Sequence, residues 1–122
     1  MKVIKSSKVA APIGPFSQGI DSGSLIFVSG QLPIGLDGIM PADPDAQARQ
    51  CMENLKAVLE AGGSALNKVV KVTVFLQNME HFTAVNEIYA SYFADVFPAR
   101  SCVQVARLPK DALVEVEAIA LK

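Results

Sequence analysis

The sequence predicts an α+β fold in which a single sheet carries two helices on one of its faces. Two segments repeat apolar residues at helical spacing, and short runs rich in β-branched residues lie before, between and after them. The order β-β-α-β-α-β-β leaves two apolar helix stripes to be covered, and a two-layer sandwich covers both. No repeat, low-complexity segment or linker interrupts this order, so residues 1–122 are expected to form one domain.

Length and composition favour an oligomer of globular subunits. The chain has 122 residues, of which 51% are hydrophobic and 19% charged, as in a globular protein. A chain of this length hides only about two thirds of its unfolded surface. The high apolar share and positive mean hydropathy indicate more apolar surface than one small globule covers, so we expect subunits to associate.

The N-terminal part of the chain contains the first two expected strands. They are "KVIK" at residues 2–5 and "SLIFVSG" at residues 24–30. The second strand is expected to end at a turn formed by Ser29 and Gly30. A long loop rich in glycine, aspartate and proline follows it.

The first helix is expected to begin after this loop. Asp43 followed by Pro44 is a favourable N-cap and first-turn pair, and Gly62 and Gly63 end the apolar pattern. The apolar residues at helical spacing are Ala48, Cys51, Met52, Leu55, Val58 and Leu59.

The next two elements are a central strand and a second helix. Residues 69–77 are β-branched and alternate, which places Val70 and Val72 on the same side of a strand. Residues 82–96 carry the second helical stripe, which Pro98 ends. The stripe consists of Phe82, Val85, Tyr89, Tyr92, Phe93 and Val96.

The last two strands are expected to form a simple hairpin around Pro109 and Lys110. In such a hairpin, alternation puts Val114, Val116 and Ala118 on the helix side of the sheet. Its other side then carries four polar residues, on a face that we expect to dock against a second subunit. These four are Arg100, Cys102, Glu115 and Glu117.

Charge and cysteine content exclude several classes of function. Eleven basic and twelve acidic residues give a net charge of −1, without a basic run that could follow a phosphate backbone. Nucleic acid is therefore not the expected partner. Cys51, Cys102 and the single histidine, His81, form no metal or disulfide pattern, so no metal is expected.

No stretch of the chain suggests export or a membrane. The N-terminal residues lack an apolar signal region, and no apolar stretch approaches the length that spans a bilayer. We therefore expect a soluble, cytoplasmic protein.

Several segments resemble a known family, the reactive intermediate deaminases called RidA or YjgF/UK114. They include "APIGPFSQGI", "VSGQLPI" and above all "PARSCVQVARLP" followed by "VEVEAIA". The resemblance implies a chorismate-mutase-like α+β sandwich, assembled as a homotrimer with a central barrel and with clefts between neighbouring subunits. It also implies hydrolysis of 2-imino acids, such as 2-iminobutyrate and 2-iminopropionate, to 2-oxo acids and ammonia.

Arg100 is the expected carboxylate clamp for such a substrate. A guanidinium binds a planar carboxylate through two parallel hydrogen bonds. The alternative is an arginine that simply pairs with Glu115 or Glu117 across the strands. The iminium carbon is already electrophilic, so a placed acid or base and a bound water suffice, and no cofactor is expected.

The resemblance assigns the proton transfer to Glu115 and further ligand contacts to backbone groups of Ser29 and Gly30. Glu117 competes with Glu115, because a simple hairpin would set Glu117 nearer to Arg100. A bulge in the strand would reverse this order, so the spacing alone leaves the choice open.

Three further residues complete the expected site. Cys102 is a pocket wall by resemblance and equally well a small buried filler. Asn86 matches a recurrent family asparagine, which either contacts the ligand or steadies the cleft. Phe16 stands where the family usually has tyrosine, so a hydroxyl expected near the substrate is absent.

Three other functions compete with imine hydrolysis. One is a protein that binds or senses a small carboxylate such as a 2-oxo acid without chemistry. Another is an endoribonuclease or translation inhibitor, which a slightly acidic chain with one histidine supports poorly. The third is a chaperone-like protein that uses exposed apolar surface.

Overall fold

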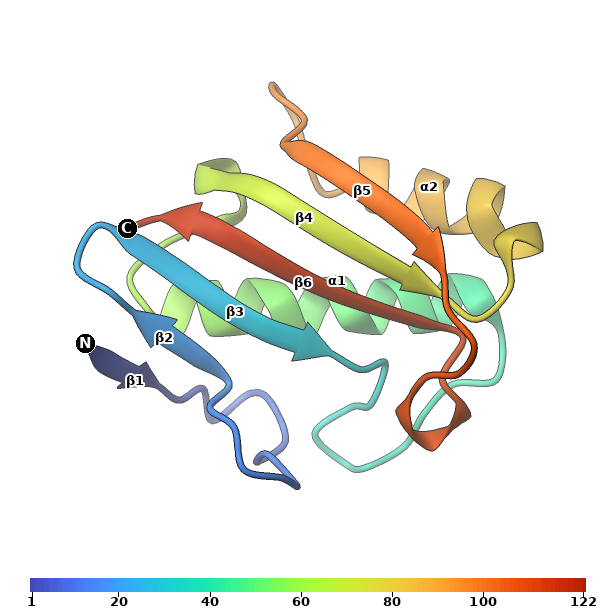
Figure 1. Ribbon diagram of the computed structural model, residues 1–122, viewed down its shortest axis with the longest axis horizontal. Helices are drawn as coiled ribbons and strands as arrows, with labels where there is room; N and C mark the ends of the chain where they lie inside the picture. Colours follow the sequence, from blue (N-terminus) through green and yellow to red (C-terminus); the bar gives the residue numbers. More distant parts are fainter.

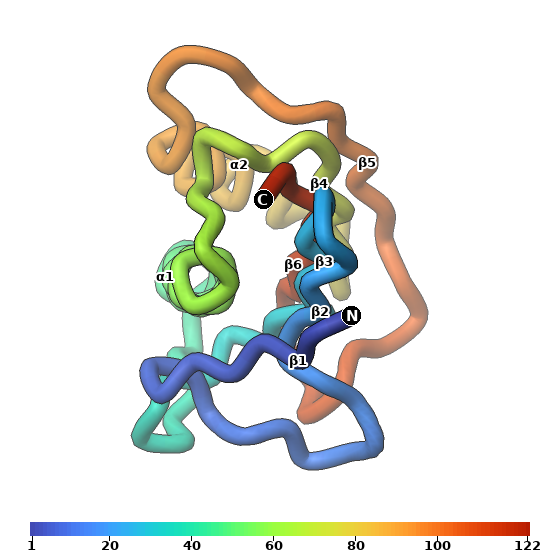
Figure 2. Tube along the Cα trace, turned by 90° about the vertical axis from the view of Figure 1, so that its left-hand side faces the viewer, coloured from blue at the N-terminus to red at the C-terminus, as the bar shows by residue number.

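The computed structural model describes residues 1–122 and has the predicted α+β architecture. Six strands form one sheet in the order β1-β2-β3-β6-β4-β5, and both helices pack on the same face of it (Figures 1 and 2). The strands are β1 (Lys2–Ile4), β2 (Gly19–Asp21), β3 (Leu25–Gln31), β4 (Val69–Leu76), β5 (Ala99–Gln104) and β6 (Val114–Leu121). The helices are α1 (Pro44–Ala61) and α2 (Phe82–Ala90), with short 3-10 turns at η1 (Leu66–Lys68), η2 (Met79–His81) and η3 (Pro109–Asp111).

Helix α1 begins and ends where the sequence predicts. The Asp43 carboxylate accepts a hydrogen bond from the Ala46 backbone N–H at 2.8 Å and so caps the first turn. Gly63, at φ 79°, takes the left-handed conformation that ends the helix. All six predicted apolar residues of α1 are buried against the sheet.

Helix α2 is shorter than predicted. It ends at Ala90, and the backbone N–H groups of Ser91, Tyr92 and Phe93 bond to carbonyls three residues earlier, as in turns. The Ser91 hydroxyl also donates to the Ile88 carbonyl at 2.6 Å, which competes with helical bonding there. The predicted helix is therefore wrong beyond Ala90, and Val96 is 79% exposed.

The sheet differs from the prediction in how its last two strands pair. β5 and β6 form no hairpin, because β4 lies between them and pairs parallel to β5 and antiparallel to β6. The connection from β4 to β5 runs through α2, and such a crossover returns the chain parallel to the strand it left. The structure also contains β2, a three-residue strand between β1 and β3 that the sequence pattern did not predict.

The new pairing changes which side chains share a face. Arg100 and Cys102 lie opposite Val72 and Val74 of β4, whose side chains are buried in the core on the helix side. Glu115 and Glu117 of β6 lie on the other, open face, opposite Phe75 and Thr73 respectively. The prediction that the arginine, the cysteine and the two glutamates share one face is therefore wrong.

One more face assignment fails at the start of β4. An irregularity in the pairing with β6 between Val69 and Lys71 turns Val69 into the core and leaves Val70 40% exposed. From Val72 onward the alternation of β4 follows the prediction.

The open face of the sheet is apolar near β1 to β3. Val3, Ile20, Phe27 and Ile119 follow one another in register across β1, β2, β3 and β6, and Val3 and Phe27 are exposed. A contiguous apolar row of this kind is typical of a surface that another chain covers. Neither helix has the length and apolar character that crossing a membrane requires.

Candidate functional site

Arg100 lies at the edge strand β5 and is held by helix α2. Its Nη1 donates a 2.7 Å hydrogen bond to Oδ1 of Asn86. Its Cζ lies 4.9 Å from the ring centroid of Tyr89 and 5.7 Å from that of Phe82. The surface hollow in front of it is also lined by Ala90, Phe97 and Pro98. We call Arg100, Asn86, Tyr89 and Phe82 the arginine cluster.

The guanidinium of Arg100 has no acidic partner within its own chain. The two ion pairs of the protein join Arg107 to Asp111 and Lys122 to Asp21. The alternative in which Arg100 pairs with Glu115 or Glu117 is therefore wrong for this chain. A half-buried guanidinium without a counter-ion has donors available for an anionic ligand.

Glu115 and Gly30 form the second part of the site, on the open face of the sheet. Between Val28 and Gln31 the register of β3 shifts by one residue against β6, which is a β-bulge. A Cβ atom on Gly30 would overlap the Glu115 carboxylate, so only glycine permits this close approach. We call Ser29, Gly30 and Glu115 the glutamate cluster.

The two glutamates differ in their surroundings. Glu115 is half-buried beside Gly30, whereas Glu117 is exposed. Burial, and secondarily the charge of Glu117, raise the pKa of the Glu115 carboxyl above its ordinary value of 4.5. Its carboxylate accepts no hydrogen bond from its own chain. A carboxyl group whose pKa is raised by burial holds a proton at higher pH than an exposed glutamate does.

Phe16 lies beside the glutamate cluster in the loop between β1 and β2. It is 51% exposed and lines a hollow with Gly30, Ile34 and Lys110. The Ser29 hydroxyl donates to the Ser17 carbonyl at 2.5 Å and so ties this loop to β3. The walls of the hollow are mainly apolar, which suits the hydrocarbon part of a small ligand.

Two buried amides, which the sequence did not single out, support these loops. Oε1 of Gln18 accepts the backbone N–H of Ser6 at 2.6 Å, and its Nε2 donates to the Ala10 carbonyl at 3.1 Å. Nδ2 of Asn54 donates to the carbonyls of Leu32 and Ile34, both at 3.0 Å. A polar residue on the core-facing side of α1 is the signal that could have identified Asn54.

The cysteines have no activating surroundings. Burial raises the pKa of the Cys102 thiol, and the charge of Arg100 offsets this only in part. Cys102 packs against the hydrophobic core, in agreement with the small-filler interpretation. The chain gathers no group of three His, Cys, Asp or Glu side chains that could hold a metal ion.

The sequence-predicted residues thus form two groups rather than one. Arg100, Asn86 and Cys102 lie on the helix side of the sheet, and Ser29, Gly30 and Glu115 lie on its open side with Phe16 nearby. Tyr89 and Phe82 had been predicted only as helix-stripe residues. Their spacing from Asn86, three and four residues, is the signal for their place beside Arg100.

Fold and site together define a class of protein: a small α+β sandwich with an unpaired guanidinium at a surface hollow on its helix side and a half-buried carboxylate on the open face of its sheet. The family model described as Endoribonuclease L-PSP matches residues 7–122. A RutC family protein of Pyrococcus horikoshii is 50% identical, with 99% of this chain and 98% of the relative covered. The 2-iminobutanoate/2-iminopropanoate deaminase of Escherichia coli is 47% identical over the same shares of both chains.

The solved structures agree with the sequence comparisons. The crystal structure of E. coli TdcF with bound serine superposes with a TM-score of 0.97 at 44% identity, covering 100% of this chain and 99% of that one. The chain belongs to the RidA (YjgF/UK114) family.

Proposed function

We propose that this protein hydrolyses reactive 2-imino acids, such as 2-iminobutyrate and 2-iminopropionate, to 2-oxo acids and ammonia. The observation that carries the proposal is Arg100, a positioned guanidinium without a counter-ion in its own chain. The E. coli relative is named for this reaction, and TdcF binds serine, whose carboxylate is the kind of group that a guanidinium holds.

The carboxylate of the substrate binds to Arg100. Asn86 occupies one N–H of Nη1, and a guanidinium has five N–H donors, so Nε and Nη2 remain for a bidentate contact. Two parallel hydrogen bonds fix the plane of the carboxylate and hence that of the adjoining imine.

A complete site needs two protomers. Arg100 and Glu115 lie on opposite faces of the sheet, so the arginine cluster of one protomer works with the glutamate cluster of its neighbour. The exposed apolar row on the open face and the free edge of β5 are the surfaces that bring neighbours together. We propose a homotrimer with three such sites, as the family resemblance implies.

Hydrolysis then proceeds through a tetrahedral carbinolamine. Water forms a C–O bond to the iminium carbon, the C=N π electrons move to nitrogen, and Glu115 accepts a proton from the water. Glu115 returns this proton to the amine, the C–N bond breaks and its electron pair leaves with ammonia. The hydroxyl proton passes to ammonia as the C=O bond of the 2-oxo acid forms, so no cofactor takes part.

The test supplies a threonine dehydratase with threonine and follows semicarbazide-trapped imine and free 2-oxobutyrate with and without the protein. Acceleration that is lost in Arg100→Ala supports the proposal. Arg49→Ala is the matched control, because Arg49 is an exposed arginine on α1 outside both clusters.

The competing functions give different results in the same experiment. Unchanged imine decay together with saturable binding of 2-oxobutyrate would identify a carboxylate-binding protein, for which the missing hydroxyl at Phe16 is the favouring observation. RNA degradation that persists through purification and disappears in Arg100→Ala would identify a ribonuclease. Either result would overturn the deaminase proposal if imine decay is not accelerated.

A further inference from the structure

Tyr89 carries the one buried side-chain polar atom of the protein without a hydrogen-bond partner. The residue is only 6% exposed, so its hydroxyl is shielded from bulk solvent. A buried hydroxyl in this condition destabilises the folded state, and phenylalanine would fill the same space without that effect. The hydroxyl therefore does not explain what Tyr89 contributes in this position.

The contact that Tyr89 does make is with Arg100. The guanidinium carbon lies 4.9 Å from the ring centroid, within the range of a cation–π interaction. Phe82, Asn86 and Tyr89 follow one another at four- and three-residue spacing, so they share one face of α2. On that face the amide of Asn86 binds one edge of the guanidinium while the two rings lie against it.

We propose that Tyr89 is a positioning residue for Arg100, acting through its aromatic ring, so that the Nε and Nη2 edge of the guanidinium points towards the ligand carboxylate. This inference rests on the proposed function, because it assigns to Arg100 the role of carboxylate clamp. A single hydrogen bond from Asn86 leaves the guanidinium free to rotate about that bond. The ring removes this freedom before the ligand arrives, which lowers the entropy lost on binding.

Two substitutions distinguish the role of the Tyr89 ring from that of its hydroxyl. Tyr89→Leu removes the ring and should raise both the Kd for 2-oxobutyrate and the KM roughly 2- to 30-fold, the range of one cation–π contact. The increase should appear in KM more than in kcat, because the clamp holds the carboxylate in the ground state and in the transition state alike. Tyr89→Phe keeps the ring and should recover most of the lost affinity, with a higher melting temperature than the wild type.

Phe93→Leu is the matched control. Phe93 contacts the Tyr89 ring, with 5.0 Å between centroids, and packs against the same core, but it does not lie against Arg100. Its replacement should lower stability without changing the affinity for 2-oxobutyrate. If Tyr89→Leu does not fold, the Nε–H resonance of Arg100 in wild-type protein and in Tyr89→Phe gives the same information, because a ring above the guanidinium shifts it upfield.

The outcomes separate the inference from the proposed function. If Arg100→Ala binds 2-oxobutyrate like the wild type, the clamp itself is wrong. If Arg100→Ala loses binding while Tyr89→Leu keeps it, the clamp stands and the role of Tyr89 is overturned. Equal losses in Tyr89→Leu and Tyr89→Phe would overturn the ring as the acting group and point to the hydroxyl.

Discussion

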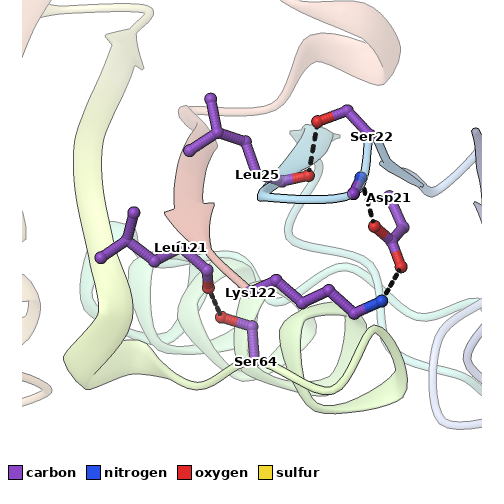
Figure 3. A network of polar contacts seen from close by, with 7 residues as sticks. Asp21, Ser22, Leu25, Ser64, Leu121 and Lys122 are labelled. Atoms are coloured by element: carbon purple, nitrogen blue, oxygen red, sulfur yellow. Dashed lines mark hydrogen bonds and ion pairs between the residues drawn. The ribbon is translucent and has the colours of Figure 1, made fainter.

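The polar side chains at the two ends of β6 differ in whether they have partners within the protomer. At its C-terminal end, Nζ of Lys122 lies 2.7 Å from Oδ2 of Asp21, and the other carboxylate oxygen of Asp21 accepts the Gly23 N–H at 2.8 Å. The Ser64 hydroxyl donates to the Leu121 carbonyl at 2.5 Å (Figure 3). We call Asp21, Ser64, Leu121 and Lys122 the C-terminal latch.

At the other end of β6, Glu115 accepts no hydrogen bond from its own chain, and on the opposite face of the sheet Arg100 of the edge strand β5 has no acidic partner. The pKa values of Asp21 and Glu115 are shifted in opposite directions. The hydrogen bond from Lys122 lowers the pKa of Asp21, whereas burial raises that of Glu115. Polar groups satisfied within the protomer stabilise the fold, and under the proposed function the unsatisfied ones serve a ligand and a neighbouring chain.

The largest effect is expected from Arg100→Ala. Two hydrogen bonds to a charged carboxylate contribute about 3 to 6 kcal/mol together, so kcat/KM should fall roughly 10²- to 10⁴-fold. Stability should fall only modestly, because the variant loses one hydrogen bond to Asn86 and two ring contacts but no ion pair. Kinetics on trapped 2-imino acids and a thermal melt measure the two quantities. A variant that keeps its activity, or one that unfolds, would place Arg100 among the residues that stabilise the fold.

Glu115→Gln should lower kcat roughly 100-fold, at the lower end of the range for a placed acid or base, since imines also hydrolyse unaided. Glu115 must be ionised to take a proton, and its pKa is raised. The activity of the wild type should therefore fall on acidification with a midpoint above pH 4.5. The activity of the glutamine variant should not show this fall at low pH. Glu117→Gln is the control, and its activity should still fall on acidification.

Asp21→Asn tests the latch. The folded-state pKa of Asp21 is lowered below its ordinary value of 3.8, so its contribution to stability is present above pH 3.8 and is lost as the pH falls through the lowered value. The variant should melt at a lower temperature than the wild type at pH 7. The difference should shrink in acid, and activity per folded molecule should stay unchanged.

Asp111→Asn is the control for this prediction. Asp111 also pairs with a basic residue, Arg107, but both side chains are mostly exposed, and such pairs contribute little. Equal losses of stability in the two variants would mean that the burial of Asp21 has no role.

The smallest effect is expected from Phe16→Tyr. The ring is about half exposed, so stability should stay within about 0.5 kcal/mol of the wild type. The rate should change by less than about tenfold, and the preference between 2-iminopropionate and larger, more apolar imino acids should shift towards the smaller one. Competition kinetics with both substrates measure this, and a change confined to stability would contradict it.

Local signals in the sequence predicted most of the elements. Asp43, Pro44 and the glycines after Ala61 fix the bounds of α1, because capping and backbone freedom are properties of a few neighbouring residues. The end of α2 was predicted too late, since an apolar spacing continues through Tyr92 and Phe93 although the backbone has already turned.

Long-range pairing was the part that sequence patterns could not provide. β5 and β6 are neighbours in the sequence, which favours a hairpin, yet the crossover through α2 pairs β5 with β4. The pairing determines on which face of the sheet Arg100 and Glu115 lie. The sequence therefore predicted both candidate site residues but placed them on the same face. Residue spacing alone could not separate Glu115 from Glu117, because the bulge at Ser29 and Gly30 involves two distant strands; only the family resemblance favoured Glu115.

The lack of a side chain at Gly30 also limits which positions near the hollow can be substituted. Under the proposed function, remodelling of the site for bulkier substrates can vary Phe16 and Ile34, which line the hollow. A methyl group at position 30 would instead displace the Glu115 carboxylate. Libraries that randomise position 30 and select for the proposed activity should therefore favour glycine, because any other residue moves this carboxylate.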